Sequence, residues 1–508
     1  MELADRDSGV DLTELLAAFS LATDLGLGQP MEHVLRSWRI ADRLAERMGL
    51  AEDERRSLFY AAMLAWVGCV ADSPEVAASF GDDIAFRADS YEVDLAGLAG
   101  AGFFLRRAGR GGSAWHRLRV ATTILTTGGQ HVVQGMQSHC VTTSTLAERL
   151  GLGPDVGRAL RQFFTRWDGR GVPAGVGGEE IAPIVRLVHL ADVVEVRHRV
   201  AGLDGALEVA RARRGSQFAP DVVDAFVTHA PEVLSDIGSG DLWLRRPLTE
   251  GELDTALEAL ADFTDLRSAS RAGHSRGVAE LAGAAARSMG LPLSDVVATR
   301  RAGLLHDIGL HGVPATVLDQ PGPLSATDWE RVRLSSYYTE RVLSRPAALA
   351  KLGAIAATAH ERRDGSGYHR GLSGASVPMT GRVLAAACAY RAMLEPRAHR
   401  PALTEKQAVA ALRAGALDPD ATEAVLAAAG NGVRRRVTGP AGLTPREVEV
   451  LVLISRGAQT GEVAERLGIS RKTAGTHIER IYTKTGASSR STATLFALRN
   501  GLLDPLDL

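Results

Sequence analysis

Apolar residues recur every three or four positions along most of this chain. The segments LAERMGL (44–50), LAGAAARSMGL (281–291) and AVAALRAGAL (408–417) show the spacing clearly. Apolar residues at this period line one face of an α-helix, whereas the alternating Val, Ile and Thr runs of strands are few here. The pattern therefore predicts an all-α protein.

The helical pattern contains a long internal repeat. Residues 33–68 align without a gap with residues 274–309, and residues 139–192 align with residues 335–388. Because this period is far longer than that of a solenoid repeat, it indicates a duplicated domain.

The repeat and the Gly/Pro-rich stretches set the expected boundaries. We expect a first domain at 10–240, with an insert near 75–130, and a second domain at 250–430. The insert contains GLAGAGFFLRRAGRGG. It could be a flexible lid, a packing arm, or an extra helical pair that fills space. The run NGVRRRVTGPAG (431–442) predicts a linker before a final domain at 443–508.

Length, charge and cysteine content limit the function classes. A chain of 508 residues is too long for one hydrophobic core, and its formal net charge of -2 gives no overall attraction to nucleic acid. Three cysteines without CxxC pairing suggest a reducing compartment. The acidic N-terminus lacks a signal core, and no apolar run approaches about 18 residues. We therefore expect a cytoplasmic protein without a membrane partner.

Candidate metal ligands lie at corresponding positions of the two copies. The second copy has His274, His306, Asp307 and His360. The first copy keeps His33, His139 and Asp192. His and Asp side chains that converge from separate helices can hold two divalent metals, which activate a water for phosphodiester hydrolysis.

Several blocks resemble the HD-GYP branch of the HD phosphohydrolase superfamily. In the second copy these are HSRGVAELA (274–282), GLLHDIG (303–309) and AHERRDGSGYHRGL (359–372). In the first copy they are RWDGRGVPAGVGGEEI (166–181) and VHLADVVEV (188–196). The resemblance implies two HD-type helical domains. Members of that family are metal-dependent phosphodiesterases, several of which act on cyclic di-GMP.

Both copies depart from the family's ligand set. In the second copy, Ser335, Ala359 and Cys388 stand where the family has two histidines and an aspartate. Hydroxyl and methyl groups cannot replace imidazole, although a thiolate could bind a soft or borderline metal. One divalent metal could remain on His274, His306 and Asp307. Alternatively, the His-Asp pair is simply hydrogen-bonded in a helical core.

The first copy has lost different ligands. Ala65-Trp66 replaces the HD pair, and Phe163-Phe164-Thr165 replaces the His-His-Glu run. These aromatic residues predict either a packed pseudo-site or a pocket for a flat or apolar ligand. Neither copy holds a complete two-metal set, which argues against catalysis.

The Gly-rich segments DGSGY (364–368) and DGRGV (168–172) have two interpretations. They can be tight turns that need positive φ, or they can present backbone donors and arginines to a phosphate-bearing ligand. The effector itself could be a nucleotide or an apolar molecule. The candidate ligand site comprises His274, His306, Asp307, His360, Arg362, Arg363, Asp364, Tyr368 and Arg370.

The final domain has strong helix signals. Thr444 is a predicted N-cap, Pro445 follows at the first helical position, Glu447 completes a capping box, and Gly457 closes the helix. A short helix at 460–468 and a longer one at 471–486, capped by Ser470, follow the helix-turn-helix plan, and 489–501 forms a fourth helix. The segment resembles the DNA-binding domain of LuxR-type regulators.

Local charge supports DNA as a partner. Six Lys or Arg residues and one acid lie between Ser470 and Asn500. The candidate DNA-binding residues are Ser470, Arg471, Lys472, Thr473, Thr476, His477, Arg480 and Lys484. Those at the start of the helix would read base edges, and the last three would hold phosphates. Gly475 weakens this helix by about 1 kcal/mol relative to Ala. The fourth helix, with Ala493, Leu495, Phe496 and Leu498, resembles the family's dimerisation helix, so a homodimer is expected.

Together these patterns predict a DNA-binding transcriptional regulator. Its degenerate HD-GYP-like region would sense a small-molecule effector, mediate dimerisation, or both. The alternative is a metal-dependent phosphodiesterase of cyclic dinucleotides with a DNA-binding output domain. A third hypothesis treats the HD-like region as a scaffold for dimerisation or protein docking.

Overall fold

The computed structural model describes residues 5–127, 129–238, 240, 242–430 and 440–503. Helices dominate these residues, which confirms the expected all-α class. Two short antiparallel strands, β1 (Asp7–Asp11) and β2 (Pro247–Thr249), are the exception in this part of the chain. No helix of the described residues is long and apolar enough to cross a membrane.

The chain folds as two compact units. The first comprises Arg6–Thr249, and the second begins at Glu250 and includes the C-terminal helices.

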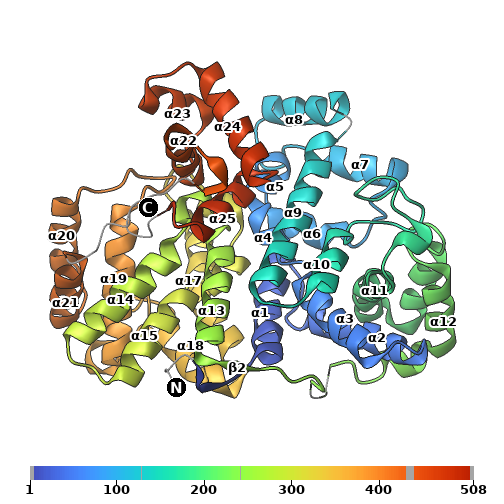
Figure 1. Ribbon diagram of the computed structural model, residues 1–508, viewed down its shortest axis with the longest axis horizontal. Coiled ribbons are helices and arrows are strands. Elements are labelled where there is room, and N and C mark those ends of the chain that lie inside the picture. Colours follow the sequence, from blue (N-terminus) through green and yellow to red (C-terminus); the bar gives the residue numbers. More distant parts are fainter. Residues whose placement is uncertain (1–4, 128, 239, 241, 431–439, 504–508) are drawn as a thin grey trace. The chain divides into compact units, whose positions relative to one another are not determined.

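The first unit is built around α1, α2, α3 and α11, the blue and green helices in Figure 1. Helix α11 packs against α2, α3 and α12, and the rings of Phe19, Phe59 and Phe226 are fully buried. The helices of this unit are α1 (Leu12–Gly26), α2 (His33–Arg47), α3 (Glu52–Leu64), α4 (Gly68–Ala71), α5 (Ser73–Phe80), α6 (Asp83–Ser90), α7 (Gly97–Arg107), α8 (Ala114–Thr126), α9 (Gln130–Arg149), α10 (Pro154–Arg161), the 3₁₀ turn η2 (Gly178–Glu180), α11 (Pro183–Ala212) and α12 (Pro220–Leu234).

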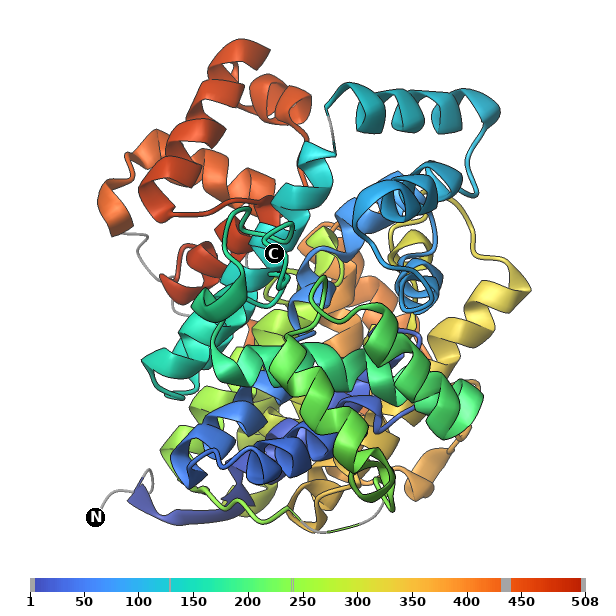
Figure 2. The same cartoon turned by 90° about the vertical axis from the view of Figure 1, so that its right-hand side faces the viewer.

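The insert of the first unit is helical. Helices α5 to α8 cover it, and α5 packs against α6. Phe80 and Phe86 stack with ring centroids 4.4 Å apart. Helix α8 has no buried residue and lies at the edge of its unit in both Figure 1 and Figure 2. The insert is therefore a small helical layer with a packed root and an exposed outer helix.

The second unit is built around α14, which packs against α15, α19 and α21. Helix α17 covers η4 and α18. The elements are α13 (Glu250–Asp265), η3 (Ala269–Arg271), α14 (His274–Ser288), α15 (Leu293–Leu305), η4 (Ile308–Gly312), α16 (Ala315–Leu318), α17 (Ala326–Leu343), η5 (Ala347–Leu349), α18 (Ala350–Ala356), η6 (Gly374–Ser376), α19 (Met379–Leu394), α20 (Glu405–Ala414) and α21 (Pro419–Ala429).

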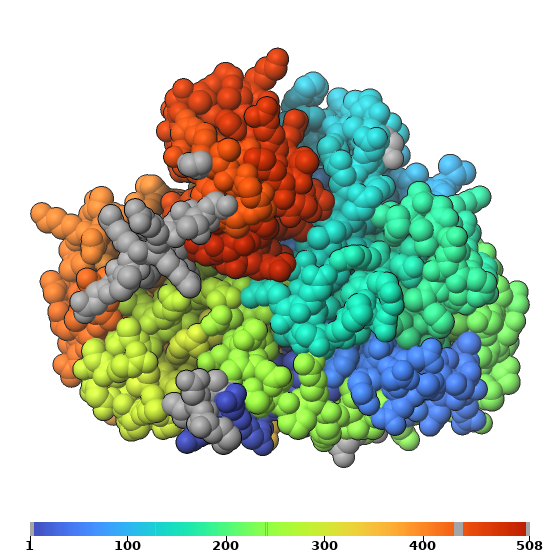
Figure 3. All heavy atoms as spheres, in the orientation of Figure 1, coloured from blue at the N-terminus to red at the C-terminus, as the bar shows by residue number. Residues whose placement is uncertain are grey.

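Residues 440–503 form the red lobe in Figure 3. The lobe contains η7 (Pro440–Gly442), α22 (Pro445–Ser455), α23 (Thr460–Leu467), α24 (Arg471–Thr485) and α25 (Arg490–Arg499). All four predicted helices are present. The predicted capping box is too, since the Thr444 hydroxyl accepts the N–H of Glu447, and the Glu447 carboxylate accepts the N–H of Thr444. Of the predicted linker, residues 431–439 lie outside the described residues.

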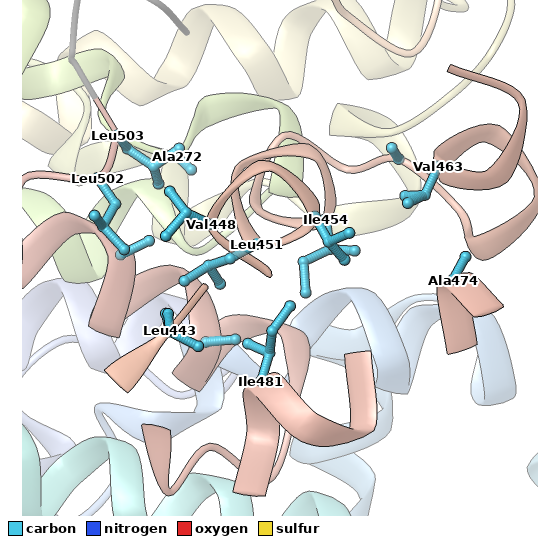
Figure 4. Close-up of a cluster of buried hydrophobic side chains, with 14 of the residues drawn as sticks. Ala272, Leu443, Val448, Leu451, Ile454, Val463, Ala474, Ile481, Leu502 and Leu503 are labelled. Carbon is cyan, nitrogen blue, oxygen red and sulfur yellow. The ribbon is translucent and has the colours of Figure 1, made fainter. Parts of the chain in front are cut away.

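The core of this lobe is apolar and closely packed. Leu451, Ile454 and Ile481 are buried at its centre (Figure 4). The same cluster includes Ala272, which lies between η3 and α14 and is 2% exposed. The helix-turn-helix lobe therefore shares its core with the segment that leads into the HD-like helices of the second unit.

Candidate functional site

Four candidate ligands converge in the second unit. His274 opens α14, His306 and Asp307 follow α15, and His360 precedes the Gly-rich turn. The Oδ2 atom of Asp307 lies 3.2 Å from Nε2 of His306 and 3.6 Å from Nε2 of His274. Nε2 of His360 lies 3.8 Å from Oδ1 of the same carboxylate. The structure thus gathers three histidines around Asp307.

Hydrogen bonds on the far side of two rings orient them toward Asp307. Nδ1 of His274 donates to Glu395 over 2.8 Å, and Nδ1 of His306 donates to the carbonyl of Gly303 over 2.8 Å. Each bond places the proton on Nδ1 and leaves the lone pair of Nε2 facing inward. Burial, together with the nearby Arg271, lowers the pKa of His274 to about 3 and that of His360 to about 4. The imidazoles are therefore neutral at pH 7, in the form that binds a metal.

A protein cation already occupies this site. The guanidinium of Arg271, from η3, contacts the Asp307 carboxylate. Its side chain is 15% exposed. Burial, followed by the neighbouring Arg397, lowers the pKa of Arg271 to about 10, so it stays charged at pH 7. Arg271 thus supplies positive charge where an HD-type site would hold a metal.

The three substituted ligand positions cannot complete a two-metal site. The hydroxyl of Ser335 donates to the carbonyl of Val332 in its own helix, over 2.6 Å. Ala359 is buried and offers no donor. Sγ of Cys388 lies 3.6 Å from Nε2 of His306. Burial raises the pKa of this thiol to about 11.

One metal is still compatible with the donors present. The ligand atoms of His274, His306 and Cys388 lie within 4.8 Å of one another. Nitrogen and sulfur donors suit a borderline metal such as zinc or iron. Such an ion would have to displace Arg271 from Asp307, and a second ion would lack ligands.

The Gly-rich segment is a tight turn beside the pocket. The Asp364 carboxylate accepts the N–H of Ser366 over 3.0 Å, and Gly365 has a φ of +78°. Buried Glu361 accepts the backbone N–H groups of Arg370 and Leu372, each over 2.9 Å. The Asp364 carboxylate is thus used to form the turn, which agrees with the interpretation of this segment as a tight turn.

The other ligand candidates of this segment lie in different places. The ring of Tyr368 stacks on that of His360 with centroids 4.8 Å apart. Arg362 and Arg363 are exposed and line a hollow of about 20 Å³, too small for a nucleotide. Arg370 instead lines a cavity of about 460 Å³, whose other polar lining includes Asp295, Glu340, Lys351, Thr358 and Glu361.

The corresponding site of the first unit is closed by aromatic side chains. The indole N–H of Trp66 donates to Oδ1 of Asp192 over 2.9 Å. Its ring packs edge-on against Phe163 at 4.8 Å and Phe164 at 6.1 Å. The adjoining cavity has a volume of about 10 Å³, the size of one water. This volume supports the packed pseudo-site over an apolar-ligand pocket.

His33 provides the positive charge in this first site. It lies 2.5 Å from Glu195 through Nδ1 and 3.1 Å from Asp192 through Nε2. Burial opposes protonation, but these two carboxylates raise the pKa of His33 to about 10. The imidazolium and the Trp66 N–H together stabilise the carboxylates without a metal.

Matching contacts support the repeat alignment. Asp24 accepts the N–H of Val34 over 3.0 Å, and Asp265 accepts the N–H of Ser275 over 2.9 Å, ten residues on in both cases. A β-carbon on Gly68 would lie 2.7 Å from the carbonyl oxygen of His139, and one on Gly309 would lie 1.9 Å from that of Ser335. Both glycines therefore permit the same close helix approach.

The third helix of the C-terminal lobe presents most of the predicted DNA-binding side chains. The hydroxyl of Ser470 caps α24 through the N–H of Thr473, over 3.0 Å. Arg471, Lys472 and Arg480 are exposed. Thr476 and His477 are half-buried on the same helix.

Lys484 has a structural contact that the sequence did not reveal. Its ammonium lies 2.7 Å from Glu447, and the Glu447 side chain is 3% exposed. Burial would raise the pKa of Glu447, but the Lys484 and Thr444 hydrogen bonds lower it to about 2. Lys484 thus joins α24 to the cap of α22, which competes with a role in holding phosphate.

The proposed dimerisation helix is largely covered within its own unit. Ala493, Leu495 and Leu498 are at most 8% exposed, and α25 packs against α22 and α13. Phe496 is partly buried. A dimer through these residues would require α25 to leave α13.

Comparison with known proteins identifies a family for the HD region of the second unit and for the C-terminal lobe. Residues 258–421 match the family model described as "HD domain", and residues 441–497 match "Bacterial regulatory proteins, luxR family". The chain contains an HD domain and a LuxR-type helix-turn-helix domain. An uncharacterized transcriptional regulatory protein of Bacillus subtilis is 42% identical over 60 residues, which are 12% of this chain and 28% of that protein.

The relatives of the HD region are cyclic-dinucleotide phosphodiesterases. The 3'3'-cGAMP-specific phosphodiesterase 3 of Vibrio cholerae is 28% identical over 425 residues, which are 80% of this chain and 92% of that protein. A crystal structure of a cyclic GMP-AMP specific phosphodiesterase of V. cholerae superposes with a TM-score of 0.58 at 26% identity, over 83% of this chain and 98% of that one. The cyclic di-GMP phosphodiesterase of Thermotoga maritima is 36% identical over 153 residues, which are 30% of this chain and 42% of that protein.

Several functional groups escaped the sequence motifs. Glu195 and Glu395 hydrogen-bond to His33 and His274 and lie outside the aligned blocks. Glu195 belongs to the segment VHLADVVEV (188–196), but nothing in that segment marked it as the partner of His33. Arg271 corresponds to Pro30 in the alignment, so no repeat pattern could indicate it. Glu195 lies within α11 and Glu395 directly follows α19, so the two glutamates share no position that would have marked them.

Proposed function

We propose that this protein is a cytoplasmic transcriptional regulator whose HD domain senses a small ligand and controls the LuxR-type lobe. In this proposal the first unit is a second HD-GYP-like copy, closed by Trp66, that now acts as a scaffold. The shared hydrogen bonds of the two copies support the duplication.

One observation carries the proposal. Arg271 contacts Asp307 in the HD pocket, and the next residue, Ala272, lies in the core of the helix-turn-helix lobe. Ala269, on the other side of Arg271, would lie 3.6 Å from a β-carbon on Gly457 in that lobe. A ligand or metal that moves Arg271 would therefore move a segment that the lobe packs on. Such a ligand shifts the equilibrium only by its difference in affinity for the two arrangements.

The phosphodiesterase relatives and the charged cavity favour a cyclic dinucleotide as the effector. Arg370 and Lys351 line the 460 Å³ cavity and can face phosphate groups. At present Arg370 pairs with Glu340, and Lys351 lies 3.1 Å from Asp295. On binding of a dinucleotide, Arg370 and Lys351 would leave these carboxylates and pair with its phosphates.

DNA binding is tested with the full chain and fluorescent duplexes from its own upstream region. The double variant Arg471→Ala/Lys472→Ala should lose at least about tenfold in affinity, since one good base contact contributes about 1–3 kcal/mol. Lys406→Ala, an exposed lysine in α20, is the control for loss of charge. Equal affinities for the double variant and the wild type would refute the assignment of α24.

Sensing is tested by repeating the titration with 3'3'-cGAMP, cyclic di-GMP and cyclic di-AMP. At least one should change DNA affinity in the wild type and have no effect in Arg370→Ala. We further propose a homodimer on DNA, formed when α25 leaves α13, and light scattering of the DNA complex would show it. A monomeric DNA complex whose DNA affinity is unchanged by all three nucleotides would contradict the sensor hypothesis.

The alternative function is a one-metal phosphodiesterase with a DNA-binding output. The donor atoms of His274, His306 and Cys388 favour it, because they are close enough to share an ion. Hydrolysis of 3'3'-cGAMP with Mn²⁺ or Fe²⁺ that His306→Ala abolishes would establish this activity. The same assay without turnover, alongside nucleotide-dependent DNA binding, would support the sensor.

A further inference from the structure

A second group of metal-type ligands lies in the first unit, and only one of its members, His139, stands at a position of the HD ligand set. Cys69 in α4, Asp72 just after it and His139 in α9 each offer one donor atom, and these atoms lie within 4.8 Å of one another. Cys69 is 6% exposed and His139 is fully buried. If the ungapped alignment is continued, Cys69 and Asp72 correspond to Leu310 and Val313, so the second unit has no counterpart.

The ring of His139 is held with a free donor atom directed into this cluster. Its Nε2–H donates to the carbonyl oxygen of Ala65 over 2.6 Å. Because a carbonyl only accepts, that bond leaves the lone pair on Nδ1. Nδ1 is buried and has no hydrogen-bond partner, and it lies 3.8 Å from Oδ2 of Asp72. An unsatisfied buried nitrogen destabilises the fold, and a bound cation would offset that cost.

The surroundings orient the other two ligands. Arg87 donates to Oδ1 of Asp72 over 2.6 Å and to the carbonyl of Cys69 over 2.7 Å, so Oδ2 remains directed toward His139. Arg87 is itself paired with Asp83 at 2.7 Å. A Cys69 thiolate, two carboxylates, one guanidinium and one divalent ion sum to zero charge. The close contact of Gly68 with His139 brings α4 against α9.

We propose that Cys69, Asp72 and His139 bind one divalent transition-metal ion, with zinc as the best match. A thiolate, an imidazole and a carboxylate are the ligand types of zinc, whereas magnesium and calcium prefer oxygen alone. Bond lengths of about 2.0–2.3 Å place neighbouring ligands of a tetrahedral zinc about 3.3–3.8 Å apart. The donor atoms, all within 4.8 Å of one another, therefore need to move together by at most about 1 Å. Water would take the fourth position beside the partly exposed Asp72.

The ion would fasten the insert to its unit. The chain leaves the unit at Asp72, forms α5 to α8, and returns at α9, which carries His139. A metal that joins Asp72 and Cys69 to His139 closes this long loop at its root. The gain would appear as folding free energy, because the ligands meet only in the folded unit.

Metal analysis of the full chain tests the site. Protein reconstituted with zinc and passed through a desalting column should hold one equivalent more than Cys69→Ser or Asp72→Asn. Cys140→Ser is the matched control, because Cys140 is a buried cysteine beside His139 that is not in the cluster. Cys388→Ser reports separately on any ion in the HD pocket. In cobalt-substituted protein that also carries Cys388→Ser, the thiolate-to-cobalt absorption should disappear on adding Cys69→Ser and persist on adding Cys140→Ser.

A proton is the competing occupant. Burial lowers the pKa of His139, but Cys69 and Asp72 raise it well above its usual value. If the cluster holds only that proton, the wild type, Cys69→Ser and Asp72→Asn will contain the same amount of zinc and show no thiolate-to-cobalt band. That result would overturn the proposal. Asp72→Asn keeps the side-chain volume, so it remains informative if Cys69→Ser is unstable.

Discussion

Replacing Arg271 with alanine should destabilise the HD domain in a way that a divalent metal can reverse. The substitution removes the cation that contacts Asp307 and leaves a carboxylate that is 2% exposed. Removing one partner of a buried ion pair costs about 3–5 kcal/mol. At about 2–4 °C per kcal/mol for a unit of this size, the unfolding midpoint should fall by about 6–20 °C.

Manganese should then restore part of this loss. The lone pairs of His274 and His306 face Asp307, and Arg271 no longer competes for the carboxylate. At a concentration 100 times its Kd, an ion adds about 2.7 kcal/mol, which is about 5–11 °C on the same scale. The wild type should gain much less, because the ion must first displace the guanidinium.

Scanning fluorimetry of metal-free protein, with and without Mn²⁺, measures both effects. Arg333→Ala is the control, since this arginine forms a surface pair with Glu330 and is 53% exposed. Such pairs contribute about 0–1 kcal/mol. If Arg271→Ala unfolds at the wild-type temperature, or if Mn²⁺ stabilises both proteins equally, Arg271 does not occupy the metal position.

Three further predictions concern the other regions. The stability that His33 contributes is fully present below its ordinary pKa of 6.5 and is lost as the pH rises toward about 10. The urea midpoint of the wild type should therefore fall over this pH range relative to that of His33→Gln. Equal pH dependence of the two urea midpoints would contradict this prediction. Glu447→Gln keeps a capping side chain but loses the Lys484 pair, so its deficit in lobe stability should shrink as the pH falls from 4.5 toward 2, where the wild-type carboxylate protonates. Gly475→Ala should stabilise α24 by about 1 kcal/mol in thermal unfolding, because a β-carbon there meets no atom within 4 Å; a loss of stability would show a contact that the structure lacks.

The C-terminal lobe could be predicted from the sequence almost residue by residue. The caps at Thr444 and Ser470 and the positive φ of Gly457 and Gly468 are local features, decided within about four residues. Helix boundaries follow from such local contacts. The Lys484–Glu447 pair spans 37 positions and could not be predicted in this way. It changes the expected role of Lys484, one of the candidate DNA contacts.

The HD pocket could be predicted only in part, for the same reason. The resemblance to the HD-GYP family suggested that His274, His306, Asp307 and His360 belong to one site, because a family pattern carries tertiary information that a single segment lacks; in the structure they lie close together. Three things were decided by tertiary structure alone. These are the position of Arg271 at Asp307, the sharing of Ala272 with the DNA-binding lobe, and the cluster of Cys69, Asp72 and His139. Each depends on loops and helix ends brought together by packing, and residue spacing along the chain does not encode those distances.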